Sequence, residues 1–213
     1  MNITQDNILI KRSSKEFIDN LLNKNPNWKV LDIGCGYTAH KKATVVCDVQ
    51  DLSNFYKNKN FIKLDGKILP FKDDEFDFVI ASHVLEHVKD VTTFIKELSR
   101  VSSKGYIELP TVLEDNLVFE NKKDHIWHME FDDIDNKLNI SEKIQYLEPV
   151  ITVSTSKKFS KIFRQSLVLE LYWEDNIEFN LIQKNKNDFQ KISRLTLFRK
   201  FLSKHLRNIL RKN

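Results

Sequence analysis

A short apolar run that ends in a glycine turn has the residue types and spacing to bind a ligand. Val30–Ile33 leads directly into Gly34, Cys35 and Gly36. Glycines at such a turn let the backbone approach a ligand closely, because no side chain stands in the way. Gly34, Gly36 and Ala39 also fit the dinucleotide fingerprint Gly-x-Gly-x-x-Gly/Ala, which is a weak signal when taken alone.

Asp32 discriminates between two kinds of ligand at this turn. It lies two residues before Gly34, in the segment that leads into the turn. A carboxylate aimed at the turn would repel a pyrophosphate but would attract the ammonium group of a methionine moiety. The alternative is a tight strand-to-loop turn with a capping aspartate. The sequence therefore favours a ligand with an ammonium group over a dinucleotide.

Two further acids follow the next apolar runs. Asp48, with Val49 beside it, comes at the end of one run, where a carboxylate can accept both hydroxyls of a ribose. Asp51 is a nearby alternative for that role. Asp48 could also be a solvated acid at the end of a strand, with no ligand. Asp65, followed by Gly66, would face the same crevice and could accept the exocyclic amine of adenine. By itself, Asp-Gly is a common turn.

A histidine motif raises the question of a metal. His83-Val84-Leu85-Glu86-His87 is a literal His-x-x-Glu-His, the inverted zinc-peptidase signature. On a helix the two histidines would share one face, as two zinc ligands must. Here the run directly follows a buried strand, is helical for barely a turn, and has no clear third ligand helix after it. We therefore assign no metal and keep a zinc hydrolase as the alternative.

Other candidate proton acceptors lie later in the chain. His125 and His128 flank Trp127 in a segment that follows the fifth predicted strand. Loops beyond the carboxyl ends of strands line the crevice in α/β folds, and imidazole suits a general base near neutral pH. Each histidine, considered alone, could equally be a surface or hydrogen-bonded residue rather than a catalytic one. Glu108 is a second candidate base, with a buried capping acid as its alternative.

The elements that must position these residues have the pattern of a buried parallel sheet. Short runs that are β-branched and apolar on both faces predict strands, and helical spacing of apolar residues predicts helices between them. Strands separated by helices or crossovers indicate an α/β fold with a doubly wound, mostly parallel sheet. The predicted strands are Trp28–Ile33, Thr44–Val49, Phe61–Leu64, Phe76–Ala81 and Gly105–Leu109, and the predicted helices are Ser13–Leu22 and Val91–Val101.

The later part predicts an insertion and an antiparallel edge. Ile126–Phe131 and Lys137–Ile140 flank a polar turn and predict a hairpin, and Lys157–Gln165 predicts a helix. Leu167–Trp173 and Ile177–Ile182 alternate around a second polar turn and predict a C-terminal antiparallel hairpin. We expect one domain over residues 1–183, with residues 111–156 as a substrate-side insertion, followed by a basic helix over residues 184–213.

Composition is that of an ordinary globular chain. The hydrophobic share is 41% and the charged share is 30%, and no apolar stretch approaches the roughly 20 residues of a membrane span. No signal peptide is visible, and two cysteines are too few for a disulfide scaffold. We therefore expect a cytoplasmic protein.

The basic charge is concentrated at one end. Residues 184–213 hold ten Lys or Arg against one acid, a net charge of +9, whereas residues 1–183 carry −5. A generally basic surface for nucleic acid is thus absent. The C-terminal segment predicts a cationic amphipathic helix, for which three arrangements stay open: packing on the core, pairing with a second subunit of a homodimer, or contact with the inner face of the membrane. Its apolar stripe is Ile192, Leu195, Phe198, Leu202, Leu206 and Ile209.

Taken together, residues 28–110 resemble the class I S-adenosylmethionine-dependent methyltransferases, in the small-molecule branch common in bacterial natural-product and surface-polysaccharide pathways. The order and spacing of the glycine turn, the three strand-end acids and the segment from Phe76 to Val88 carry the resemblance. Thr38 stands where many members have a third glycine, and the helix after it is nearly missing. Both departures from the family pattern affect the part of the site that would hold the methionine end of the cofactor.

The resemblance implies a cofactor, a reaction and a set of roles. The cofactor would be S-adenosyl-L-methionine, and the acceptor a small molecule or a sugar or glycan precursor, methylated on O or N. A cofactor-binding but inactive partner protein is an alternative. His83, with His125 or His128, would be the base. The implied cofactor residues are Asp32 and Gly34, Cys35 and Gly36 for the methionine part, Asp48 with Val49 for the ribose, Asp65 with Gly66 for the adenine amine, and Ser82 beside the methyl group.

Overall fold

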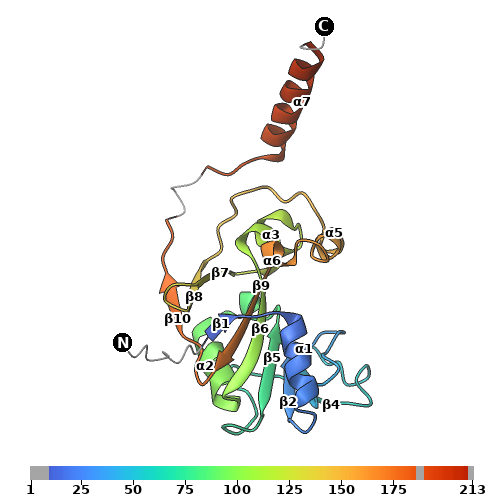
Figure 1. Cartoon of the computed structure of the whole chain (residues 1–213), viewed down its shortest axis with the longest axis vertical. Helices are drawn as coiled ribbons and strands as arrows, with labels where there is room; N and C mark the ends of the chain where they lie inside the picture. Colours follow the sequence, from blue (N-terminus) through green and yellow to red (C-terminus); the bar gives the residue numbers. More distant parts are fainter. Residues whose placement is uncertain (1–9, 186–189, 211–213) are drawn as a thin grey trace, which may run out of the picture.

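A seven-stranded sheet forms the centre of the molecule (Figure 1). The computed structural model describes residues 10–185 and 190–210. The strand order is β1-β9-β6-β5-β2-β3-β4, and every neighbouring pair is parallel except the two that involve β9. The predicted α/β, mostly parallel fold class is therefore confirmed. The strands are β1 (Ile10–Arg12), β2 (Val30–Ile33), β3 (Val45–Asp48), β4 (Asn60–Lys63), β5 (Phe78–Ser82), β6 (Lys104–Pro110) and β9 (Val168–Glu174).

Two predicted helices form, each with a capping side chain at its N-terminus. In α1 (Lys15–Lys24), the Ser14 hydroxyl accepts the N–H of Phe17 and so caps the first turn. In α2 (Val91–Val101), Asp90 caps the first turn through the N–H of Thr93. The apolar residues of α2, spaced three or four apart, are buried on one face. Between β5 and α2, η1 (Leu85–His87) is a single 3₁₀ turn.

A second, three-stranded sheet lies beside the first. Strands β7 (Trp127–Asp132) and β8 (Lys137–Glu142) form the predicted antiparallel hairpin, and β10 (Phe179–Ile182) pairs with β8 in parallel. The prediction that Leu167–Trp173 and Ile177–Ile182 form a hairpin with each other is therefore wrong. Strand β9 is buried over six of its seven residues and so takes an inner place between β6 and β1, whereas β10 is exposed over three of its four residues and joins the smaller sheet.

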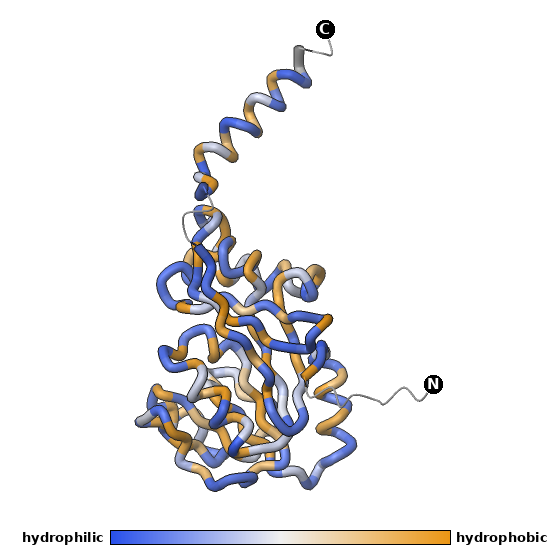
Figure 2. The backbone as a smooth tube through the Cα atoms, turned by 90° about the vertical axis from the view of Figure 1, so that its left-hand side faces the viewer, coloured by the Kyte–Doolittle hydropathy of each residue, from blue (hydrophilic) through white to orange (hydrophobic). Residues whose placement is uncertain are grey.

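Short helices and loops cover the carboxyl end of the central sheet. They are α3 (Val112–Leu117), α4 (Asn121–Asp124), α5 (Val153–Phe159) and α6 (Arg164–Leu167). The one helix predicted over 157–165 is thus two helices with a break between them. Helix α7 (Arg194–Leu210) extends away from the rest of the molecule, and apolar and polar residues alternate along it (Figures 1 and 2).

Candidate active site

A cavity of about 1120 Å³ opens at the carboxyl ends of β2, β5 and β6. Strand β2 has β3 on one side and β5 on the other, so the order of the strands reverses there. Ligands of open α/β sheets bind at such a switch point. The short helices α4, α5 and α6 contribute the opposite wall. The cavity therefore lies where the sequence places a ligand.

The glycine turn forms one side of the cavity in a conformation that favours glycine. Gly34 and Gly36 have φ angles of 64° and 46°. A Cβ on Gly34 would also lie 2.5 Å from a methyl carbon of Val84. The amides of Gly34 and Cys35 both donate to the carbonyl of Cys47, at 2.8 and 3.2 Å. The turn is therefore fixed against β3, with its backbone facing the cavity.

Asp32 presents a buried carboxylate to the same cavity. It is only 5% exposed, and its Oδ2 accepts the N–H of His40 at 2.6 Å. Burial raises the pKa of Asp32 to about 6, although that amide and the nearby charges of His40 and Lys59 partly oppose the shift. The ionised carboxylate of a buried acid beside an open backbone turn can accept hydrogen bonds from an ammonium group and balance its charge. These residues fit the methionine end of S-adenosylmethionine.

The residues predicted for ribose and adenine lie outside the cavity lining. Asp48 is buried, and its two oxygens accept the amides of Gly36 and Gln50, both at 2.9 Å. It therefore also braces the glycine turn, a role that the sequence did not indicate. Val49 is 70% exposed, and Asp65, which pairs with Lys63 at 3.2 Å, is exposed, as is Gly66. Their roles toward the cofactor stay predictions.

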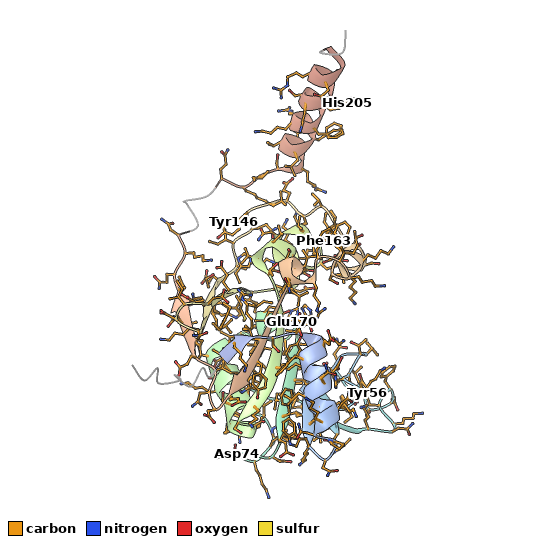
Figure 3. All side chains as sticks on the ribbon, viewed as in Figure 1. Tyr56, Asp74, Tyr146, Phe163, Glu170 and His205 are labelled. Carbon is orange, nitrogen blue, oxygen red and sulfur yellow. The ribbon has the colours of Figure 1, made fainter. Side chains whose placement is uncertain are left out.

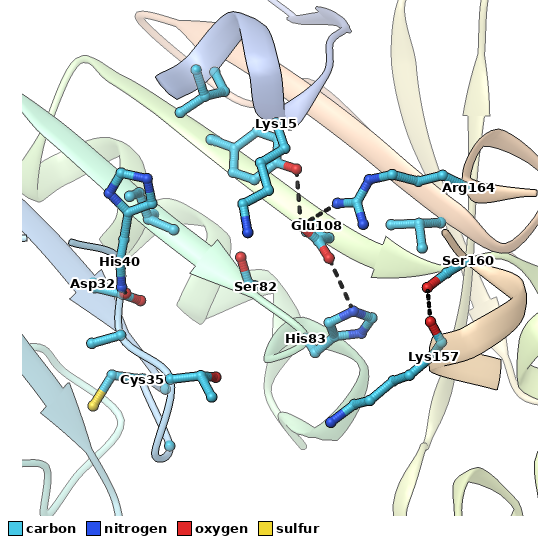
Figure 4. Close-up of a pocket in the computed structure, with 18 of the residues that line it drawn as sticks. Lys15, Asp32, Cys35, His40, Ser82, His83, Glu108, Lys157, Ser160 and Arg164 are labelled. Carbon is cyan, nitrogen blue, oxygen red and sulfur yellow. Dashed lines mark hydrogen bonds and ion pairs between the residues drawn. The ribbon is translucent and has the colours of Figure 1, made fainter. Parts of the chain in front are cut away.

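His83 follows Ser82 at the end of β5, and both line the cavity. Its Nδ1 lies 3.3 Å from Glu86 and its Nε2 lies 3.3 Å from Glu108 (Figure 4). Partial burial opposes a charge on the ring, but hydrogen bonds and charges from Glu108 and Glu86 outweigh it and raise the pKa of His83 to about 10. The ring is therefore an imidazolium at neutral pH. To serve as a base, it must first lose that proton.

Glu108 connects His83 to a second group of charged residues. Its Oε2 accepts one N–H of Arg164 (Figure 4) and the Tyr106 hydroxyl, both at 2.9 Å, and Arg164 also binds Glu170. Burial would raise the pKa of Glu108, but His83 and Arg164 hold it at about 2. Glu108 is thus a fixed anion, and Arg164 and Glu170 are site residues that the sequence analysis missed.

Asp115 joins the two predicted histidines of the insertion. Its carboxylate lies 2.5 Å from Nδ1 of His125, 3.3 Å from Nε2 of His128 and 3.0 Å from Nζ of Lys143. Burial alone would raise the pKa of Asp115, but the hydrogen bonds from His125 and His128, with the charge interactions of His125 and Lys143, outweigh burial and hold that pKa well below its usual range. His125 lines the cavity, whereas His128 is 1% exposed beneath Asp115 and does not line it. We therefore assign His128 a positioning role.

Known proteins resemble this chain in sequence. Residues 31–107 match a family described as a methyltransferase domain. The chain is 31% identical to an uncharacterised protein of Methanocaldococcus jannaschii, over 82% of each chain. It is 33% identical to a ubiquinone biosynthesis O-methyltransferase of Pelagibacter ubique, over 43% of this chain and 44% of that protein. It belongs to the class I S-adenosylmethionine-dependent methyltransferases. S-adenosylmethionine is the cofactor of this methyltransferase.

Solved structures resemble the methyltransferase more distantly. A protein of Pyrococcus horikoshii is 17% identical with a TM-score of 0.43, over 76% of this chain and 92% of that one. An S-adenosylmethionine-dependent methyltransferase of Aquifex aeolicus is 16% identical with a TM-score of 0.38, over 72% and 87%. Within residues 10–185 and 190–210, no helix is long and apolar enough to cross a membrane.

Proposed function

We propose that this methyltransferase methylates a hydroxyl group of a small molecule, with sugars and other glycan precursors as the first class to test. S-adenosylmethionine, when bound, supplies a methyl group activated on a sulfonium. A hydroxyl has a pKa far above neutral and needs a proton acceptor or a metal, whereas an amine needs only to arrive neutral. The observation that carries the proposal is the contact of His83 with Glu108 in the cavity, because His83, once it has lost its own proton, can accept one from a hydroxyl.

The size and lining of the cavity support a small polar acceptor. Pockets for one ligand usually measure about 300–1000 Å³. A cavity of about 1120 Å³ therefore has room for an acceptor beside the methionine end of the cofactor. Lys15, Lys157 and Arg164 line it together with Glu114 and Glu120, which suits an acceptor rich in hydrogen-bonding groups.

The relatives support the small-molecule class. One is named a ubiquinone biosynthesis O-methyltransferase, and another, from Corynebacterium glutamicum, a demethylmenaquinone methyltransferase that is 30% identical over 49% of this chain and 48% of that protein. Both names refer to small molecules. Because each match spans less than half of this chain, the similarity supports the class of acceptor and not the acceptor itself.

A transfer assay tests the proposal. The purified full chain is incubated with S-adenosylmethionine labelled in its methyl group and with sugar nucleotides, phenols and matching amines, and products are identified by mass spectrometry. We expect label on hydroxylated acceptors, and much less label with Asp32→Asn at a cofactor concentration that does not saturate the variant. Label on amines alone would replace O- by N-methylation. Cofactor binding without any transfer would favour the inactive partner protein.

A further inference from the structure

The fold brings Glu86 and His87 next to His125, a residue far away in the sequence. One ligand atom from each of the three lies within 4.8 Å of the others, and the two imidazole rings meet edge to face at 4.6 Å. Imidazole nitrogen and carboxylate oxygen are common protein ligands of transition metals. We infer that Glu86, His87 and His125 bind a divalent transition-metal ion of the Zn²⁺ type.

Glu86 supplies an independent indication of a cation site. Its side chain is 1% exposed, and Oε1 lies 3.3 Å from Nδ1 of His83. Its Oε2 is buried and has no hydrogen-bond partner within the part of the chain that the structure describes. A buried carboxylate oxygen without a partner is costly, so such an atom is uncommon in folded proteins. A metal ion at this position would satisfy it.

Both histidines are held as metal-bound histidines usually are. Nδ1 of His125 is engaged by Asp115 at 2.5 Å, and Nδ1 of His87 by the backbone carbonyl of Asp124 at 2.9 Å. Hydrogen bonds at Nδ1 orient the ring and leave Nε2 as the ligand atom. Asp115 is held in turn by Lys143 at 3.0 Å.

The backbone around the three residues is fixed. The N–H of Ile126 donates to the carbonyl of Glu86 at 2.8 Å, and the indole N–H of Trp127 donates to the carbonyl of Val88 at 2.8 Å. These bonds join the start of β7 to η1, next to the three candidate ligands. Such preorganisation lowers the cost of assembling a metal site.

The site differs from the zinc-peptidase arrangement that the His-x-x-Glu-His sequence suggests. His83 turns toward Glu108, and His125 takes the place of His83 beside His87. Three protein ligands leave coordination positions open, and His87 and His125 both line the cavity. An acceptor oxygen could occupy such a position. This last role rests on the proposed function, whereas metal binding does not.

Calorimetry on the full chain, stripped of metal with a chelator, tests the site with Zn²⁺, Co²⁺ and Mg²⁺ as probes. We expect one equivalent of Zn²⁺ or Co²⁺ to bind, and Mg²⁺ to bind far more weakly because it prefers oxygen ligands. His87→Ala and His125→Ala should each weaken Zn²⁺ binding at least about tenfold, and Asp115→Asn about 10–100-fold through His125. His205→Ala, on exposed α7, is the matched control and should bind as the wild type does.

Circular dichroism and thermal melting of each variant separate loss of the site from loss of the fold. If His125→Ala unfolds, the site is tested with His87→Ala instead, because His87 is exposed. Wild-type binding no tighter than that of the folded His87→Ala variant would overturn the inference. Loss of Zn²⁺ binding in His83→Ala but not in His125→Ala would also overturn it. Methyl transfer is measured separately, so metal binding can fail while transfer succeeds, and the reverse.

Discussion

At the residue scale, the site contains carboxylates whose pKa values are shifted in opposite directions, upward by burial and downward by cationic partners. Asp32 has few partners, and burial raises its pKa to about 6. Glu108 has His83 and Arg164 beside it, so its pKa falls to about 2 despite burial. The fold therefore keeps one acid ready for an incoming cation and keeps the other paired within the protein.

Asp32→Asn should increase the free energy of unfolding while it weakens cofactor binding. The folded-state pKa of Asp32, about 6, lies above its ordinary value of 3.8, so the ionised side chain destabilises the fold at high pH. The cost is absent below pH 4, grows between pH 4 and 6, and reaches about 3 kcal/mol above. The variant should thus be more stable than the wild type in chemical denaturation at pH 8 but not at pH 4.

In contrast to its stability, the cofactor affinity of Asp32→Asn should fall. Loss of a charged partner for the ammonium group should weaken S-adenosylmethionine binding by about 1.5–3 kcal/mol in calorimetry. Wild-type affinity should also fall as the pH drops below 6, because Asp32 is then protonated. Asp135→Asn, at an exposed turn position, is the matched control. Unchanged affinity in Asp32→Asn would remove Asp32 from the methionine site.

His83→Ala tests whether the His83–Glu108 pair acts on the acceptor. With a hydroxyl acceptor, turnover should fall about 10²–10⁴-fold, the usual contribution of a general base, while cofactor affinity stays nearly intact. His205→Ala should leave both unchanged. The measurement is steady-state kinetics combined with calorimetry. If cofactor affinity falls as much as turnover does, His83 is a structural wall of the cavity.

The single residues show how far sequence reasoning reaches. Asp32 and the glycine turn could be predicted because their spacing follows from local strand-to-turn geometry. His83 could be placed at the cavity, but its charge could not, because Glu108 lies on a different strand. Asp115, Arg164 and Glu170 contact the site only through tertiary folding, and no local pattern marks them.

At the element scale, β6 and β9 meet so closely that one glycine is required. A Cβ on Gly105 would lie 2.0 Å from the indole ring of Trp173, which is fully buried. Gly105→Ala should therefore destabilise the protein by about 1–3 kcal/mol through overpacking, measured by urea denaturation. At Gly66 a Cβ would meet nothing within 4 Å, so Gly66→Ala is the matched control. Equal stability of the two variants would contradict this packing argument.

Elements that bury both faces were predicted well, and those defined by distant partners were not. The strands β2 to β6 appear in the sequence as short β-branched runs between turn residues. Strand β1, only three residues long, shows no such pattern and forms because Ile10–Arg12 pairs with β9. Strand β10 alternates like a hairpin arm, yet alternation cannot say which strand it joins, and it pairs with β8.

At the scale of the whole molecule, the apolar face of α7 is left uncovered by the other described residues. Its residues Leu195, Phe198, Leu202 and Leu206 are each at least 41% exposed. The alternative in which this stripe packs on the core is therefore not realised within the described residues. The side chain of Ile209 lies outside them. Figure 3 shows side chains of α7, including His205, projecting away from the rest of the molecule.

The basic charge of this segment favours an anionic membrane surface as its partner, and we propose that α7 lies on one. Residues 184–213 carry a net charge of +9, and each base near such a surface contributes on the order of 1 kcal/mol. The full chain should sediment with anionic vesicles but not with neutral ones, and salt should weaken the binding. A version that ends at Ser193 should lose the binding. That endpoint keeps Ile192 hydrogen-bonded to Tyr146 and Glu148, so the rest of the fold stays intact.

A charge-reversed variant separates the membrane from a second subunit. Lys200→Glu, on exposed α7, keeps the apolar stripe but reduces the basic charge, so it should weaken vesicle binding without changing the oligomeric state. Analytical ultracentrifugation of the full chain and of the version that ends at Ser193 gives the oligomeric states. If the full chain is a dimer, the shortened one is a monomer and neither binds vesicles, then α7 is an interface between two copies and the membrane proposal fails.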